Sequence, residues 1–188
     1  MARPRSDDKR SAILAAAIRV IAAQGLSAPT ASIAKEAGIS NGSLFTYFET
    51  KADLLNELYL ELKTEMVAAA LAGLPTKSDA RRQLLHMWRQ WLDWAVASPD
   101  KRRAFSHLSV SDELTAETRE TGNRAMIGIA ALIERSRKTG PLRASPLDFV
   151  AALMSGMADT TMDFMINDPA NADKHCKTAF EAVWRMLA

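Results

Sequence analysis

The chain has 188 residues, of which 48% are hydrophobic and 24% are charged. This composition is typical of an ordinary soluble globular protein and excludes an intrinsically disordered one. The net charge is +2, but residues 1–51 hold seven Lys or Arg against four Asp or Glu, a local balance of +3. That excess favours a polyanionic partner for the first part of the chain.

The N-terminal 25 residues, MARPRSDDKRSAILAAAIRVIAAQG, are predicted to form an amphipathic helix. Acidic residues and Arg19 interrupt the apolar run, which argues against a signal peptide. Two uncharged stretches further on are about half as long as the ~20 residues of a membrane-spanning helix, so we expect no membrane span. A single cysteine, Cys176, excludes an intrachain disulfide and fits the cytoplasm.

Helix start and stop signals recur along the chain, and no run of residues resembles a strand. Thr50 with Asp53 forms a variant of the capping box. The other candidate N-caps are Thr30, Thr76, Ser98, Ser111 and Ser145.

Glycine and proline supply the predicted helix ends. An all-α fold of about nine helices follows. They cover residues 8–24, 30–37, 41–47, 51–72, 77–97, 99–109, 112–139, 146–167 and 170–187.

Residues 30–47 have the lengths of a helix-turn-helix, with a turn at Gly38-Ile39-Ser40 between two short helices. At about 100° per residue, a helix that buries Leu44 and Phe48 points Gly42 and Thr46 outward. The apolar residues expected inside are Ile33, Ala37, Ile39, Leu44 and Phe48.

The outward face, with Ser43 and Phe45 flanking Gly42, combines a glycine with hydrogen-bonding side chains. A glycine permits close approach to a ligand, and hydroxyl and amide groups can bond base edges. The alternative is a helical corner whose polar residues are merely solvated. Phosphate contacts are expected from Thr30, Ser32, Tyr47 and Lys51, while Arg3 and Arg5 either reach a minor groove or form a solubilising tail.

The segment TASIAKEAGISNGSLFTYFETKADLL, residues 30–55, closely resembles the DNA-binding segment of the TetR family of bacterial transcriptional repressors. The resemblance implies phosphate contacts from Thr30, Tyr47 and Lys51. Phe45 departs from the tyrosine usual in the family, so the target sequence does not transfer. The implied recognition contacts fall among Ser40, Asn41, Gly42, Ser43, Phe45 and Thr46.

The resemblance also implies an N-terminal three-helix DNA-binding domain, residues 1–50, and a larger helical bundle, residues 51–188, for effector binding and dimerisation. Dimerisation would use the last two long helices and implies a palindromic operator. The predicted helix 146–167 carries two apolar stripes, which suits one partner inside the subunit and one across a dimer. The alternative buries both stripes within one subunit. The stripes are Phe149, Leu153, Gly156, Met157, Thr160 and Phe164, and Val150, Met154, Ala158, Met162 and Met165.

Aromatic and methionine residues in the second part of the chain suggest a pocket for a largely apolar effector. The alternative assigns these side chains to the core. The candidate lining residues are Trp88, Trp91, Phe105, His107, Met126 and Met157, with Trp94, Met154, Asp159 and Asp163 as further possibilities.

His86, His107 and His175 lack metal-ligand spacing, and His175 beside Cys176 does not form a nucleophilic pair on a helix. We therefore expect no metal, no cofactor and no enzymatic activity. The leading hypothesis is a ligand-responsive transcriptional repressor. A helical-bundle enzyme and a nonspecific DNA-binding protein remain as alternatives.

Overall fold

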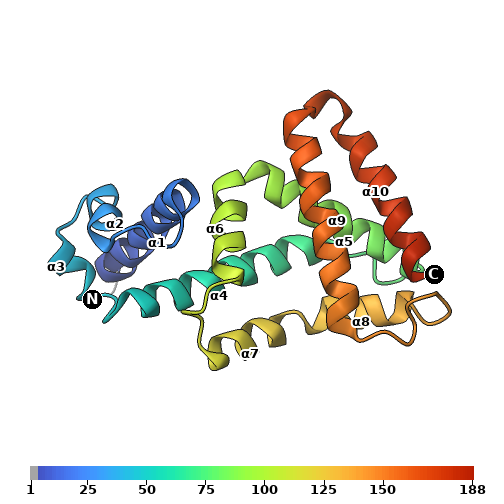
Figure 1. Cartoon of the computed structure of the whole chain (residues 1–188), viewed down its shortest axis with the longest axis horizontal. Coiled ribbons are helices and arrows are strands. Elements are labelled where there is room, and N and C mark those ends of the chain that lie inside the picture. Colours follow the sequence, from blue (N-terminus) through green and yellow to red (C-terminus); the bar gives the residue numbers. More distant parts are fainter. Residues whose placement is uncertain (1–3) are drawn as a thin grey trace. The chain divides into compact units, whose positions relative to one another are not determined.

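The computed structural model describes residues 4–188, with side chains from Asp7 onward. Every regular element within these residues is helical, which confirms the all-α prediction (Figure 1). Ten α-helices and one 3-10 turn are present there, one α-helix more than expected. They are α1 (Pro4–Gln24), α2 (Thr30–Glu36), α3 (Asn41–Leu44), α4 (Lys51–Leu71), α5 (Ala80–Ala97), α6 (Pro99–Ser109), α7 (Ala116–Ala125), α8 (Ile127–Ser136), α9 (Leu147–Asn167), η1 (Pro169–Asn171) and α10 (Ala172–Leu187).

The helices form two compact units. Unit 1 comprises the described residues up to Thr64 together with Ser98–Asn123, and unit 2 comprises Glu65–Ala97 with Arg124–Ala188. Helix α4 contributes residues 51–64 to unit 1 and 65–71 to unit 2. The functional division after residue 50 stays a prediction.

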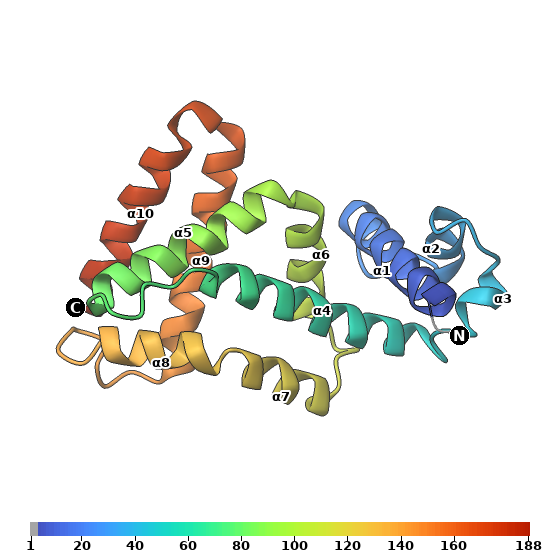
Figure 2. The same ribbon diagram turned by 180° about the vertical axis from the view of Figure 1, so that it is seen from behind.

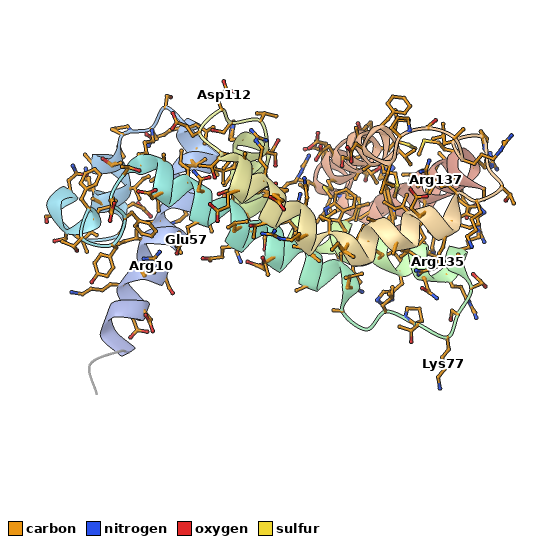
Figure 3. All side chains as sticks on the ribbon, turned by 90° about the horizontal axis from the view of Figure 1, so that it is seen from below. Arg10, Glu57, Lys77, Asp112, Arg135 and Arg137 are labelled. Atoms are coloured by element: carbon orange, nitrogen blue, oxygen red, sulfur yellow. The ribbon has the colours of Figure 1, made fainter. Side chains whose placement is uncertain are left out.

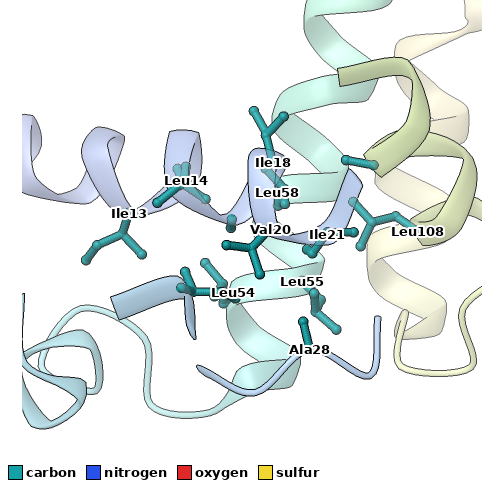
Figure 4. Close-up of a cluster of buried hydrophobic side chains, with 14 of the residues drawn as sticks. Ile13, Leu14, Ile18, Val20, Ile21, Ala28, Leu54, Leu55, Leu58 and Leu108 are labelled. Atoms are coloured by element: carbon teal, nitrogen blue, oxygen red, sulfur yellow. The ribbon is translucent and has the colours of Figure 1, made fainter. Parts of the chain in front are cut away.

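Unit 1 has an apolar core in which α1 packs against α2 and α6 (Figure 4). Helix α1 buries Ile13, Ala17 and Ile21 at helical spacing, and α4 supplies Leu54 and Leu58. Each fully buried isoleucine or leucine side chain contributes about 1.5–3 kcal/mol of transfer free energy. The N-terminal helices therefore rest on a core that α4 and α6 complete.

The loop between α6 and α7 is fastened to α4 by one side-chain amide. Asn56 donates from Nδ2 to the Glu113 carbonyl (2.8 Å), and its Oδ1 accepts from the Thr115 backbone N–H (2.9 Å). Close by in the chain, a Cβ added at Gly122 of α7 would lie 2.9 Å from the Tyr59 ring. A glycine at this position lets α7 approach α4.

In unit 2, α9 and α10 run side by side, and α5 lies against both of them and against α8 (Figures 1 and 2). The fully buried Trp88 of α5 donates its indole N–H to the Cys176 carbonyl of α10 (3.3 Å). Burial raises the pKa of the Cys176 thiol, because desolvation disfavours the thiolate. A Cβ at Gly140 would lie 1.7 Å from the Leu187 carbonyl oxygen, so only glycine fits where this loop meets the end of α10.

The loop from α8 to α9 is organised by the buried side chain of Arg137, which is labelled in Figure 3. Its Nη1 donates to the carbonyls of Leu142 (2.7 Å) and Ser145 (2.6 Å), and its Nη2 donates to Glu134 Oε1 (2.6 Å). The Arg137 guanidinium lowers the pKa of Glu134 by hydrogen bonding. One cation thus satisfies the Ser145 carbonyl and adds a second hydrogen bond to the Leu142 carbonyl, which also accepts from the Ser145 N–H (3.1 Å).

Two predicted helices were too long, for identifiable reasons. The prediction 41–47 was wrong beyond Leu44, because the Thr46 hydroxyl donates to the Ser43 carbonyl (2.7 Å) and Tyr47 N–H bonds Leu44 instead (3.0 Å). The single helix 112–139 is in fact α7 and α8, separated at Met126. Glycines stand near both sides of this break and weaken helix formation there.

The capping predictions had mixed outcomes. The capping box is confirmed, with Thr50 N–H bonded to Asp53 Oδ2 (2.9 Å) and Asp53 N–H bonded to Thr50 Oγ1 (3.1 Å). Asp79 rather than Thr76 caps α5, so that helix begins at Ala80.

At the remaining starts, Ser98 is confirmed as the N-cap residue of α6, before Pro99, and the other predicted cap residues were wrong. Thr115 rather than Ser111 caps α7, because its Oγ1 accepts from the Thr118 N–H (3.1 Å). Thr30 is the first residue of α2 rather than its cap, and Ser98 makes no capping hydrogen bond. Helix α9 starts at Leu147, after Pro146 rather than after a Ser145 cap. Within residues 4–188, no helix combines the length and the apolar character that crossing a bilayer requires.

Candidate nucleic-acid interface

Helices α2 and α3 are joined by a tight turn whose geometry depends on Gly38. Gly38 has φ +69°, a left-handed conformation that favours glycine, and the next residue, Ile39, donates its N–H to the Ala34 carbonyl (3.0 Å). Ile33, Leu44 and Phe48 are buried, as predicted for the inner side of a helix-turn-helix. The second helix is therefore held by its apolar side.

Residues 40–47, which we term the reading segment, expose the side that the sequence predicted. Asn41, Gly42, Ser43 and Thr46 are exposed, and Phe45 is 40% exposed. Tyr47 is half-buried against the core of unit 1. Small polar groups and one aromatic ring thus share a single accessible surface.

Several hydroxyls of the reading segment already make internal hydrogen bonds. Ser40 caps α3, with its Oγ accepting from the Ser43 N–H (3.1 Å) and lying 2.8 Å from Ser43 Oγ. The oxygen atoms can still accept further bonds. The Asn41 side chain, by contrast, forms no hydrogen bond with any residue that the structure describes. Its amide is therefore free to donate and to accept.

No internal contact requires glycine at position 42. A Cβ added there would meet only Ser40 Oγ at 4.0 Å, and Gly42 has no positive φ. The space above it is open to solvent. This is the local environment expected where a backbone comes close to another molecule.

The predicted phosphate-contact residues flank the reading segment. Thr30 and Ser32 are half-buried at the start of α2. Lys51 donates from Nζ to the carbonyls of Leu26 (2.6 Å) and Ala28 (2.8 Å), which leaves one N–H of the ammonium for another acceptor.

The N-terminal arginines lie beyond what the structure describes in detail. Arg3 is outside the described residues, and for Arg5 the backbone alone is described, as part of α1.

Comparison with known proteins places this geometry in a family. The sequence model of the bacterial regulatory proteins of the tetR family matches residues 13–58, from α1 into α4. A structure from Shewanella sp. PV-4, assigned to the TetR family of transcription regulators, is 28% identical and covers 94% of this chain and 96% of its own, with a TM-score of 0.82. The chain belongs to the TetR family.

Two further relatives extend the likeness. A TetR family transcription regulator from Marinobacter aquaeolei VT8 shares the fold over 99% of this chain and 98% of its own, with a TM-score of 0.87 and 23% identity. The fatty acid metabolism regulator protein of Bacillus subtilis (strain 168) is 32% identical over 73 residues, which is 38% of each chain. Membership of the TetR family confirms the predicted family and supports a ligand-responsive DNA-binding regulator.

One residue beside the reading segment was missed by sequence reasoning. Arg10 of α1 pairs with Glu57 of α4, donating from Nε to Oε1 (2.6 Å) and from Nη2 to Oε2, and its Nη1 donates to the Tyr47 carbonyl (3.0 Å). Its guanidinium also stacks 4.5 Å from the Phe48 ring centroid. Hydrogen bonding to Glu57 raises the pKa of Arg10. Arg10 and its partner are far apart in sequence, so no local pattern announces the pair.

Of the residues predicted to line an effector pocket in this TetR family member, four lie in unit 2. Trp88 is fully buried and meets Trp91 edge-on, with ring centroids 6.0 Å apart. Met126 and Met157 are half-buried, at the break between α7 and α8 and on α9. The hydrogen bond and burial of Trp88 make it a core residue of unit 2, whereas Trp91 stays partly accessible.

The two other predicted pocket residues belong to unit 1. Phe105 of α6 stacks on Tyr59 of α4, with centroids 5.6 Å apart and an interplanar angle of 14°. His107 is exposed. A ligand role for these six residues stays a prediction.

Proposed function

We propose that this protein is a ligand-responsive transcriptional repressor that binds a palindromic DNA operator as a homodimer. The observation that carries the proposal is the reading segment, an exposed polar surface on a helix whose other side is locked into a core. The side-chain amide of Asn41 has no hydrogen-bond partner among the described residues. No contact within the fold requires a glycine at position 42. Both suit base edges in a major groove.

In this proposal, Asn41, Ser43 and Thr46 make contacts to bases, with Ser40 and Gly42 allowing close approach. Phe45 supplies an apolar contact, for example with a thymine methyl group. Phosphate contacts come from Thr30, Ser32, Tyr47 and the third N–H of Lys51, and they fix the register of the protein on the duplex.

Dimerisation is proposed through α9 and α10. The stripe of α9 that contains Phe149 (52% exposed), Leu153 (37%) and Phe164 (57%), which we term the outer stripe, is accessible in the single chain. The opposite stripe of α9, including Val150 and Met154, is buried within unit 2. Exposed large apolar side chains at helical spacing suit burial against a second copy.

The effector is proposed to be a largely apolar small molecule. The Bacillus subtilis relative is named a regulator of fatty acid metabolism, and that name favours a ligand with a hydrocarbon chain for this protein as well. Trp91 and Met157 are partly accessible apolar side chains of unit 2 that suit such a ligand. Release from DNA requires that the effector bind the two states of the dimer with different affinity. The proposal assigns the protein no catalytic role and a cytoplasmic site of action.

The deciding experiment is selection of bound sequences from a random DNA library with the purified protein at a stated salt concentration. Recovery of one palindromic motif is expected. A folded protein that recovers no motif, and binds competitor DNA equally well, would point to nonspecific binding and overturn the proposal.

Two asparagines of unit 1 provide a variant and a matched control for the sequence selection. Asn41→Ala is expected to relax base preference at one position of each half-site. Asn123→Ala removes the same group from an exposed position of α7 that makes no hydrogen bond with the described residues. The Asn123→Ala variant should recover the motif of the unchanged protein.

A further inference from the structure

The end of the reading segment is poorly supported by its own backbone. Helix α3 has four residues and ends at Leu44. Beyond it, Tyr47 and Phe48 both donate their N–H groups to the Leu44 carbonyl (3.0 and 3.1 Å). A helix this short has almost no intrinsic stability, so contacts from elsewhere in unit 1 must set its orientation.

Arg10 makes those contacts from three directions. Its guanidinium holds the Glu57 carboxylate of α4 through two N–H groups and the Tyr47 carbonyl through a third, and its central carbon lies over the Phe48 ring, 4.5 Å from the centroid. Figure 3 shows the side chains of Arg10 and Glu57 pointing toward each other. The planar fork of arginine fits this set of partners, whereas a lysine ammonium would not.

We propose that Arg10 is the positioning residue that fixes the reading segment to α4, an inference that rests on the proposed DNA-binding function. The Tyr47 carbonyl and the Phe48 ring lie directly after the residues that would meet bases. Fastening them to Glu57 sets the direction in which Asn41 to Thr46 face. Arg10 acts through these partners and does not touch DNA itself.

The competing role for Arg10 is a direct phosphate contact, since its side chain is 40% exposed. The two roles predict opposite effects on DNA affinity when the negative charge of Glu57 is removed. A phosphate contact would be weakened by the neighbouring carboxylate, so removing that negative charge would strengthen DNA binding. A positioning residue needs the carboxylate, so the same change would weaken binding.

The test measures operator affinity of full-length Arg10→Met, Arg10→Lys and Glu57→Gln variants over a range of salt concentrations, using the selected operator and an unrelated duplex. Arg10→Met should lose about tenfold in operator affinity, the value of one base contact, with an unchanged salt slope. Arg10→Lys should resemble Arg10→Met, because the charge is kept and the fork is lost. Glu57→Gln should weaken operator binding, and the Arg10→Met/Glu57→Gln double variant should be no worse than Arg10→Met.

Arg19→Met is the matched control, because Arg19 lies on the same helix and pairs with Glu36 through a single contact of 2.6 Å. An exposed pair of this kind should change affinity by less than about threefold. A salt slope that falls by about one unit in Arg10→Met, tighter binding by Glu57→Gln, or unchanged operator affinity in Arg10→Met would each overturn the inference.

Amide hydrogen exchange without DNA gives a readout independent of the proposed function. Arg10→Met should speed exchange at Thr46, Tyr47 and Phe48 relative to amides of α5, while Arg19→Met should not. If the unchanged protein selects no operator, the proposed function fails, and exchange alone decides the role of Arg10. Equal exchange in Arg10→Met and the unchanged protein would then refute positioning.

Discussion

The reading segment and the outer stripe of α9 are both exposed, yet their chemistry differs. The reading segment presents an amide, hydroxyls and bare backbone around Asn41 and Gly42. The outer stripe presents Phe149, Leu153 and Phe164, each more than one-third exposed. A polar surface gains specificity from directed hydrogen bonds, whereas an apolar one gains free energy from area removed from water. The two surfaces thus differ in the way that the two partners proposed above, DNA and a second copy of the chain, would require.

The difference also concerns what holds each surface in place. The outer stripe belongs to a 21-residue helix whose opposite side is buried. The reading segment contains only the four-residue helix α3, and its position depends on Leu44, Phe48 and Arg10. Long-range contacts therefore matter more for the reading segment than for the outer stripe.

The largest expected effect comes from making the outer stripe polar. Phe149→Glu combined with Leu153→Glu should convert the dimer to a monomer and lower operator affinity by more than about 100-fold, because two charged groups cannot be buried unpaired. Sedimentation and DNA titration measure the two effects. Ser155→Glu is the control, since Ser155 is exposed about 120° around α9 from Phe149. If the double variant stays dimeric, the outer stripe of α9 is not part of the dimer interface.

A substitution away from both surfaces should have a smaller effect, which changes the stability of the fold and leaves DNA recognition unchanged. Arg137→Met removes the hydrogen bonds that organise the loop before α9, and we expect the free energy of unfolding to fall by about 2 kcal/mol. Base preference should be unchanged. Chemical denaturation and repeated sequence selection measure the two quantities. A changed motif would mean that the comparison of two separate surfaces is too simple.

The same variant should alter the response to acid. Because Arg137 lowers the pKa of Glu134 in the folded state, this pair stabilises the fold above the ordinary pKa of glutamate, and the stabilisation is lost as pH falls through the lowered value. Arg137→Met should therefore lose less stability on acidification than the unchanged protein does. Melting temperatures across the acidic range measure the difference.

Gly42→Ala tests whether the backbone of the reading segment comes close to DNA. The added methyl group meets no atom closer than 4.0 Å, so the melting temperature should stay the same or rise, since alanine favours helix by up to about 1 kcal/mol. Operator affinity should fall by about tenfold if the backbone approaches base edges. Unchanged affinity would show that position 42 lies away from DNA.

The smallest expected effect is that of Lys51→Ala on the salt dependence of binding. If the third N–H of the ammonium meets a phosphate, binding to all sequences should weaken by a few fold and the salt slope should flatten by about one unit. A lower melting temperature with an unchanged salt slope would instead show that Lys51 acts only through its hydrogen bonds to the Leu26 and Ala28 carbonyls.

The exposed side of α3 and the two apolar stripes of α9 could be predicted because helical periodicity is a local property. Once Leu44 and Phe48 were assigned to the core, the outward direction of Gly42 followed from 100° per residue. The two stripes of α9 followed in the same way, and the buried one is confirmed by Val150 and Met154.

The contacts that span long sequence distances could not be predicted. Arg10 and Glu57 are 47 residues apart, and neither stands in a motif. From the sequence, Lys51 is expected to be a surface cation. Its hydrogen bonds to the Leu26 and Ala28 carbonyls are evident only from the tertiary structure. The close approach of Gly140 to Leu187 depends equally on the tertiary fold. Periodicity specifies directions, whereas these pairings depend on how the helices pack.

The buried thiol of Cys176 makes the chain convenient for spectroscopic labelling. It is the single cysteine, it is 3% exposed, and burial raises its pKa, so little reactive thiolate is present at neutral pH. A cysteine introduced at exposed Asn123 or Ser155 would react with a maleimide dye far faster than the native one. Fluorophores could thus report on unit 1 and unit 2 in turn without first replacing Cys176.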